Sequence, residues 1–252
     1  MKAKKQILPA MVKKIVMSLV LCFFLVCPMT THAHVFNETF IAFRDTVYLQ
    51  NQDIQGTNNL YTAAKQDIEK SLTGVDKYLA LSRCEYLMGI SFKAAGRDSE
   101  AAGFFEQGIR WAEESLAIQP TSDGYLLLGT NISFLCEVRR SYGLRNFGKI
   151  EENARKALEL DPNSLMAQHL IASRYIVAPW PFADVRRGAA ILEEIIRQDY
   201  LSLEKEDLFG LYLLLEAACI KQRKNQEAQT WRERAAAIYP GNNFISLLMN
   251  VR

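Results

Sequence analysis

A similar helix ending occurs three times in this chain, and it constrains the possible fold more than any other feature. The endings are ESLAIQP, KALELDP and RAAAIYP, which finish at Pro120, Pro162 and Pro240. The first interval is 42 residues and the second is 78, so a fourth ending without proline, near residues 195–200, would divide the longer interval in two. A proline just past a helix stops it, because the ring has no N–H and disfavours helix in the preceding residue. The chain therefore contains an internal helical repeat.

The first unit carries an ordered pattern of small and aromatic residues. In the stretch YLMGISFKAAGRDSEAAGFF, Gly89 and Ala101 are small, Phe92 and Phe105 are aromatic, and Gly96 lies between the two expected helices. Small residues let two helices approach closely, and aromatic side chains fill the adjoining space. This order resembles the tetratricopeptide repeat (TPR) family, whose unit is an antiparallel helix pair. The resemblance implies an array of such pairs.

The last unit follows the same pattern and departs from it once. Glu216 stands where the family has a small residue. The matching positions are Tyr212, Leu215, Ala228, Ala235 and Pro240.

The units are longer than the 34 residues usual in the family, and the extra length can be located. In the first unit we expect helix 99–118 to be longer by about two turns. In the second unit we expect the surplus at residues 139–149, between the two helices. In the third unit about five extra residues coincide with the stretch APWPF at 178–182, which we interpret as an insertion in a helix–helix turn.

These observations predict an all-α protein, a right-handed α-solenoid of antiparallel helix pairs. We expect one repeat domain over residues 34–252, with four recognisable pairs and caps at about 34–75 and 241–252. Two apolar-periodic helices within 35–72 would form a degenerate first pair or an N-terminal cap. We expect the repeat domain to form an extended helical array.

The N-terminus has the order of a secretory signal peptide. Five lysines and no acid precede an uncharged run at residues 15–27, and a small-residue cleavage site follows at 31–33. Thirteen residues are too few to span a bilayer comfortably. We therefore expect residues 1–33 to be removed and the chain to be exported to the periplasm. Two alternatives remain, an uncleaved anchor and a lipid on Cys27, although Cys27 does not follow a small residue as a lipidation site requires.

Without the leader the chain has 25 basic and 28 acidic residues, a net charge of −3, so nothing in it favours a nucleic-acid partner. Cys84, Cys136 and Cys219 remain, and each lies in an apolar helical run that predicts a packed side chain and no disulfide framework. No motif of a hydrolase, a phosphate-binding loop or a metalloprotease occurs. We therefore expect no enzyme, no cofactor and no metal site. The acidic residues of the stretch EKED at 204–207 are interpreted as solvated charge near a helix start.

The TPR resemblance implies that function lies on the concave surface lined by the first helix of each pair. Projecting the family pattern gives a mixed polar set suited to an extended peptide or a modest polar ligand. For each position the alternative is plain solvated lining. The predicted partner-binding residues on this surface are Arg83, Tyr86, Asp123, Thr130, His169, Ser173 and Lys221.

Trp180 and Phe182, in the APWPF insertion, complete the predicted set. Two interpretations of this insertion remain. The favoured one is that both aromatic rings cover the open end of the helical core. The other is an exposed aromatic loop that contacts a partner or a neighbouring subunit.

Two functions remain open for such a chain. The first is a protein-interaction scaffold or adaptor of the bacterial cell envelope, with a protein or peptide partner in the groove. The second is an accessory subunit that binds a small ligand for a periplasmic transport system. The second rests on a general likeness to the periplasmic TPR-like subunits of tripartite ATP-independent (TRAP) transporters: exported, all-helical, with lengthened units.

Overall fold

The computed structural model describes residues 38–50, 53–178 and 181–242. The chain divides into two units, Met1–Val35 and Phe36–Arg252, and every described residue belongs to the second. The predicted leader and residues 243–252 of the C-terminal cap lie outside the described residues, so both stay predictions. All regular elements of the described residues are helical: α2 (Glu38–Leu49), α3 (Ile54–Ser71), α4 (Gly74–Ala94), α5 (Asp98–Ile118), α6 (Ser122–Val138), α7 (Arg140–Leu160), α8 (Leu165–Val177), α9 (Val185–Ile196), the 3-10 turn η1 (Tyr200–Ser202), α10 (Lys205–Lys221) and α11 (Asn225–Ile238).

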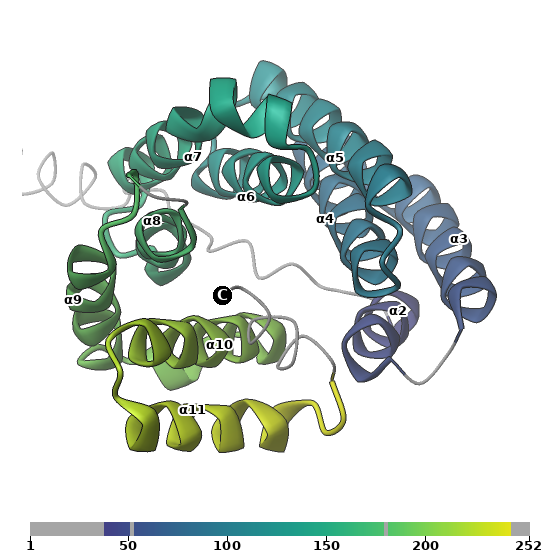
Figure 1. Ribbon diagram of the computed structural model, residues 1–252. Coiled ribbons are helices and arrows are strands. Elements are labelled where there is room, and N and C mark those ends of the chain that lie inside the picture. Colours follow the sequence, from purple (N-terminus) through teal and green to yellow (C-terminus); the bar gives the residue numbers. More distant parts are fainter. Residues whose placement is uncertain (1–37, 51–52, 179–180, 243–252) are drawn as a thin grey trace, which may run out of the picture. The chain divides into compact units, whose positions relative to one another are not determined.

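Consecutive helices pack as pairs, and each pair packs on the next. The second helix of a pair contacts the first helix of the following pair, as α5 contacts α6 and α7 contacts α8. Figure 1 shows α4, α6, α8 and α10 on the inner side and α5, α7, α9 and α11 on the outer side. The prediction of an all-α solenoid of helix pairs is therefore confirmed, with α2 and α3 as an additional pair before the four predicted ones. None of the described helices combines the length and the apolarity needed to cross a bilayer.

Helices α4 and α5 pack closely, as the pattern of small and aromatic residues predicted. A Cβ added at Gly89 would lie 2.5 Å from Cε1 of Phe105, so only glycine fits there. Ala101 and Phe105 are both fully buried. Gly96 joins the two helices with φ +71°, a left-handed conformation that glycine adopts without steric cost. Each of these residues has the role that the family pattern implies.

Helix ends also follow the prolines. Helices α5, α7 and α11 each end two residues before Pro120, Pro162 and Pro240, and α9 ends at Ile196 without a proline. The extra length of the first unit lies in α5, as predicted. In the second unit the prediction was wrong: residues 140–149 form the first turns of α7, and only Arg139 separates α7 from α6. Helix α7 accommodates the surplus because Ile150, Ala154 and Ala157 keep one apolar face along it.

The position of Glu216 in α10, where the family has a small residue, is occupied by an ion pair. The Glu216 side chain is fully buried, and its Oε1 accepts from Nε of Arg232 at 2.7 Å. Arg232 lies on α11, the partner helix. An ion pair therefore connects α10 and α11, whereas α4 and α5 are connected by the close contact of small residues.

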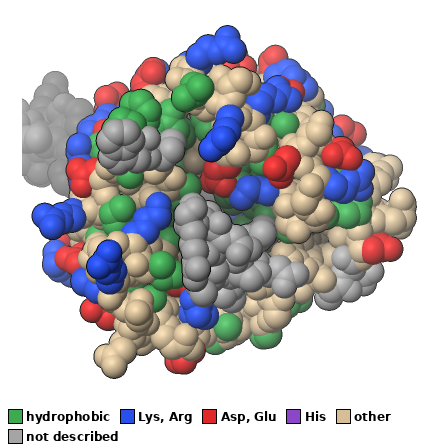
Figure 2. Space-filling view, in the orientation of Figure 1, with side chains coloured by type: hydrophobic (Ala, Val, Ile, Leu, Met, Phe, Trp, Pro, Cys, Tyr) green, Lys and Arg blue, Asp and Glu red, His purple; other side chains and the backbone are tan. Residues whose placement is uncertain are grey.

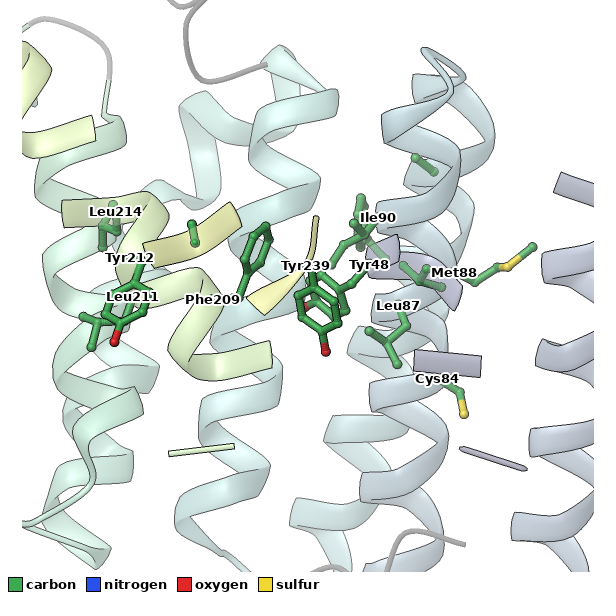
Figure 3. Packing of buried hydrophobic residues seen from close by; sticks show 14 of the residues in the cluster. Tyr48, Cys84, Leu87, Met88, Ile90, Phe209, Leu211, Tyr212, Leu214 and Tyr239 are labelled. Carbon is green, nitrogen blue, oxygen red and sulfur yellow. The ribbon is translucent and has the colours of Figure 1, made fainter. Parts of the chain in front are cut away.

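The first helix of the array contacts α10 and Tyr239, the residue that follows α11. Tyr48 of α2 stacks on Tyr239 with ring centroids 4.9 Å apart, and both rings contact Phe209 of α10. Figure 3 shows these three rings between side chains of α4 on one side and of α10 on the other. In a solenoid each repeat usually contacts only its neighbours. Here a shared apolar core joins the two ends of the array, a contact that the sequence did not predict.

Candidate functional site

An inner-side contact, here called the closure site, connects α2 and α4 with the start of α10. Nη1 of Arg44 lies 2.9 Å from Oε2 of Glu206 and 3.6 Å from Glu204. Nη2 of Arg83 lies 3.2 Å from Oε2 of Glu204 and also pairs with Oε1 of Glu206. Glu206 is only 4% exposed. Two guanidinium groups from the N-terminal half thus hold carboxylates from the C-terminal half.

Aromatic and polar contacts surround these ion pairs. The hydroxyl group of Tyr239 donates to Oδ1 of Asp45 at 3.1 Å, and the side-chain amide of Asn242 donates to the backbone oxygen of Tyr48. Nζ of Lys205 lies 3.8 Å from Asp45 and 4.4 Å from the centre of the Tyr239 ring. The closure site therefore combines a buried apolar stack with charged groups at its edge.

Asp207 is the titratable group that stands out at the closure site. Burial raises the pKa of this carboxyl to about 7, and the carboxylates of Glu206, Glu204 and Asp123 add to the rise, while Arg83 opposes it. Because the closed arrangement disfavours the charged form, it is most favourable when Asp207 is neutral. We therefore expect the closure site to respond to pH near neutrality.

The predicted partner-binding residues Arg83, Tyr86 and Asp123 come together at or near this site. Tyr86 forms a hydrogen bond with Tyr48, and its ring lies 5.2 Å from Phe134. Burial raises the pKa of the Tyr86 hydroxyl above its usual range. Arg83 and Tyr86 therefore have partners within the chain, whereas the TPR resemblance implied a concave surface for an external partner.

The other predicted residues lie farther along the inner helices. His169 of α8 forms a hydrogen bond with the backbone of Gly210 in α10, and burial lowers its pKa to about 4. Nζ of Lys221 donates to the backbone oxygen of Ile176 at 2.6 Å. Ser173 donates to Leu170 at 3.0 Å within α8, and Thr130 lies partly buried on α6. His169 and Lys221 thus connect α8 to α10.

The APWPF insertion lies between α8 and α9, as predicted. Phe182 is 54% exposed, so the interpretation that its ring covers the core is wrong for this residue. Trp180 lies outside the described residues, and its role stays a prediction. Asp184 ends the insertion by accepting from the backbone N–H of Arg187 at 3.0 Å, which caps α9.

Sequence reasoning missed the acidic half of the closure site. The stretch EKED was interpreted as solvated charge, but Glu206 is buried and paired with two arginines. An acid at the start of a helix is already explained by the helix dipole. The sequence therefore offered no reason to expect that Glu206 pairs with arginines far away in the chain. Among the described residues, no three His, Cys, Asp or Glu side chains are placed to hold a metal ion. Cys84 and Cys219 are buried, Cys136 is partly buried, and all three are free thiols.

Comparisons with known proteins find similarity at low sequence identity among solved structures. No protein-family model and no curated protein matches the chain. Among solved structures, a kinesin-light-chain-type protein of Podosopora anserina with nearly identical TPR-like repeats is 17% identical, with a TM-score of 0.40 over 79% of this chain and 93% of that one. The TPR protein YrrB, described as having an unusual peptide-binding site, is 13% identical, with a TM-score of 0.34 over 84% of this chain and 96% of that one.

The helix pairs of the chain itself therefore define its class, an α-solenoid of TPR-like units. Its distinguishing feature is the contact between the two ends of the array.

Proposed function

We propose that this protein is a non-enzymatic interaction scaffold of the bacterial cell envelope that binds a protein or peptide partner through the inner side of its first helices. The observation that supports this most directly is the convergence of Arg83, Tyr86 and Asp123 at the closure site. Charged and aromatic side chains held together by the fold are suited to recognition, because little further ordering is needed on binding. Export to the periplasm follows from the predicted leader.

The distribution of surface charge does not compete with this assignment. Figure 2 shows Lys and Arg side chains interspersed with Asp and Glu over the face in view, without a large patch of one sign. Many of them pair along single helices, as Arg155 does with Glu151 and Lys156 with Glu152. Exposed pairs of this kind contribute little to stability or recognition.

Affinity capture from envelope extract tests the assignment, with the wild-type protein as bait. Replacing Arg83 by alanine is unsuitable, because it would leave buried Glu206 with one cation fewer and destabilise the fold. Thr130→Arg instead adds a bulky side chain on the predicted inner face of α6 without removing an ion pair. We expect this variant to fold and to lose the captured partner.

The matched control is Thr62→Arg on the exposed face of α3, which should retain the partner. Equal capture by both variants would place the binding surface away from the inner side.

Mass spectrometry of the exported protein should show an N-terminus at or near His34.

A second function, an accessory small-ligand subunit of a periplasmic transport system, is favoured by one observation. Asp207 at the start of α10 and His169 of α8, which bonds to the backbone of Gly210 in α10, are both polar inner-helix groups with pKa values shifted by burial. A short segment or a small molecule reaches such groups more easily than a folded domain does. Capture of no macromolecule by the wild-type protein would favour this alternative.

A further inference from the structure

Arg44 and Arg83 have the arrangement of a carboxylate receptor. They come from α2 and α4, and both contact Glu204 and Glu206, which follow more than 120 residues later in the chain. The Arg83 guanidinium also lies 5.8 Å from the centre of the Phe40 ring, within the range of a cation–π contact. Guanidinium groups recognise carboxylates through several directed hydrogen bonds, and partial burial strengthens these contacts.

The carboxylates that occupy this receptor bring an excess of negative charge. Three cationic side chains at the closure site, Arg44, Arg83 and Lys205, face a larger number of acids. These acids are Asp45, Asp123, Glu204, Glu206 and Asp207. Three of these acids, Glu204, Glu206 and Asp207, belong to the internal occupant, and like charges at short range repel. A segment that brings two carboxylates without a third therefore suits the two arginines better than the internal occupant does.

We propose that Arg44 and Arg83 form a binding site for an acidic protein segment, and that the chain's own Glu204 and Glu206 occupy this site until such a segment displaces them. The inference rests on the proposed function for the inner side and adds the chemistry of the partner. The start of α10 then acts as an internal competitor, and displacing it separates α10 from α2.

The pH dependence of this competition follows from Asp207. It faces Arg83 and Tyr86 from α4, Tyr48 from α2, Asp123 from α6, and Glu204 and Glu206 beside it on the chain. Its pKa is raised to about 7 in the closed arrangement. Below about pH 4 Asp207 is neutral both in the closed arrangement and when α10 is displaced, so closure is fully favoured there. This advantage decreases as the pH rises through 7, so an external acidic segment should bind better at pH 8 than at pH 6.

A peptide that copies residues 199–208, with asparagine in place of Asp207, provides the probe. Its binding to the purified protein is measured by fluorescence anisotropy. The control peptide has glutamine in place of Glu204 and Glu206 and should not bind. The protein variant Glu204→Gln/Glu206→Gln keeps the shape of the internal segment but removes its charges, so its receptor is available. We expect this variant to bind the acidic peptide at least tenfold more tightly than the wild type at pH 6.

A second comparison uses variants that leave the ion pairs intact. Wild-type binding should tighten severalfold between pH 6 and pH 8, and Asp207→Asn should remove this change. If circular dichroism shows that the double glutamine variant does not fold, this comparison decides alone. Wild-type binding that is absent, or equal at both pH values, would overturn the proposal.

Two further results would also overturn it: equal binding of the control peptide, and no gain in affinity for a folded double glutamine variant. Displacement of the peptide by free glutamate at the same carboxylate concentration would contradict the assignment to a protein segment. None of these measurements uses the envelope partner. Peptide binding can therefore fail while affinity capture succeeds, and affinity capture can fail while the peptide binds.

Discussion

Gly89 shows how strongly one position can depend on a missing side chain. Its Cα faces the ring of Phe105, and the ring is fully buried against the same helix pair. Gly89→Ala should therefore destabilise the protein by about 1–3 kcal/mol through overpacking. Gly103 lies in α5 with no atom within 4 Å of an added Cβ, so Gly103→Ala should stabilise it by about 0.5–1 kcal/mol. Urea unfolding of both variants measures the two effects, and equal effects would contradict the assigned packing of α4 on α5.

His169 makes a separate contribution to the pH dependence of stability. Burial lowers its pKa from 6.5 to about 4, so the folded protein holds this side chain neutral. Its contribution is present above about pH 6.5 and is lost as the pH falls toward 4, because the unfolded chain binds the proton first. Urea midpoints at pH 7, 6, 5 and 4 should decrease less for His169→Gln than for the wild type. Parallel decreases would show that His169 is accessible to protons in the folded state.

At the scale of the helices, the sequence predicted most of the structure correctly. Gly89, Ala101 and Phe105 are fixed by contacts between neighbouring helices, and Gly96 by a left-handed turn. Such local requirements leave a pattern in the sequence. The start of α7 was predicted incorrectly because the stretch RRSYGLRNFGK is rich in glycine and charge, as loops are. The buried face that continues at Ile150 and Ala154 decides in favour of helix.

The connection between α8 and α9 leads to a prediction at the same scale. Because the Phe182 ring is mostly exposed, Phe182→Ala should change the free energy of unfolding by less than about 0.5 kcal/mol. Ile176 precedes the same connection and is fully buried, so Ile176→Ala should cost about 2–5 kcal/mol. Thermal or urea unfolding distinguishes the two. Loss of partner capture by folded Phe182→Ala would assign the ring to an interface.

For the molecule as a whole, the closure site is the part that sequence reasoning could not predict. Tyr48 and Tyr239 are 191 positions apart, and no repeat pattern relates them. The same holds for Arg83 and Glu206, whose charges are equally compatible with solvated helix surfaces. Arg83, Tyr86 and Asp123 were named from the sequence as partner-binding residues, and that role stays a prediction. The contacts that Arg83 and Tyr86 make within the chain were not predicted.

Tyr239→Ala tests how far the closure site couples the two ends. The ring is fully buried and stacked on Tyr48, so its loss should cost about 3–5 kcal/mol. Hydrogen exchange followed by mass spectrometry should show α2 and α11 losing protection together, although they are distant in sequence. Leu144→Ala, at a position 81% exposed, should leave exchange unchanged. Loss of protection in α11 alone would mean that the ends behave independently.

The contact of Tyr48 with Phe209 and Tyr239 also restricts how this chain can vary in length. An open solenoid can gain or lose a unit by duplication or deletion, because every unit needs only its two neighbours. Here an inserted or deleted helix pair would displace α10 from α2 and break the contact. The number of helix pairs is therefore set by the requirement that the two ends meet. Duplication of an internal unit would not preserve this structure.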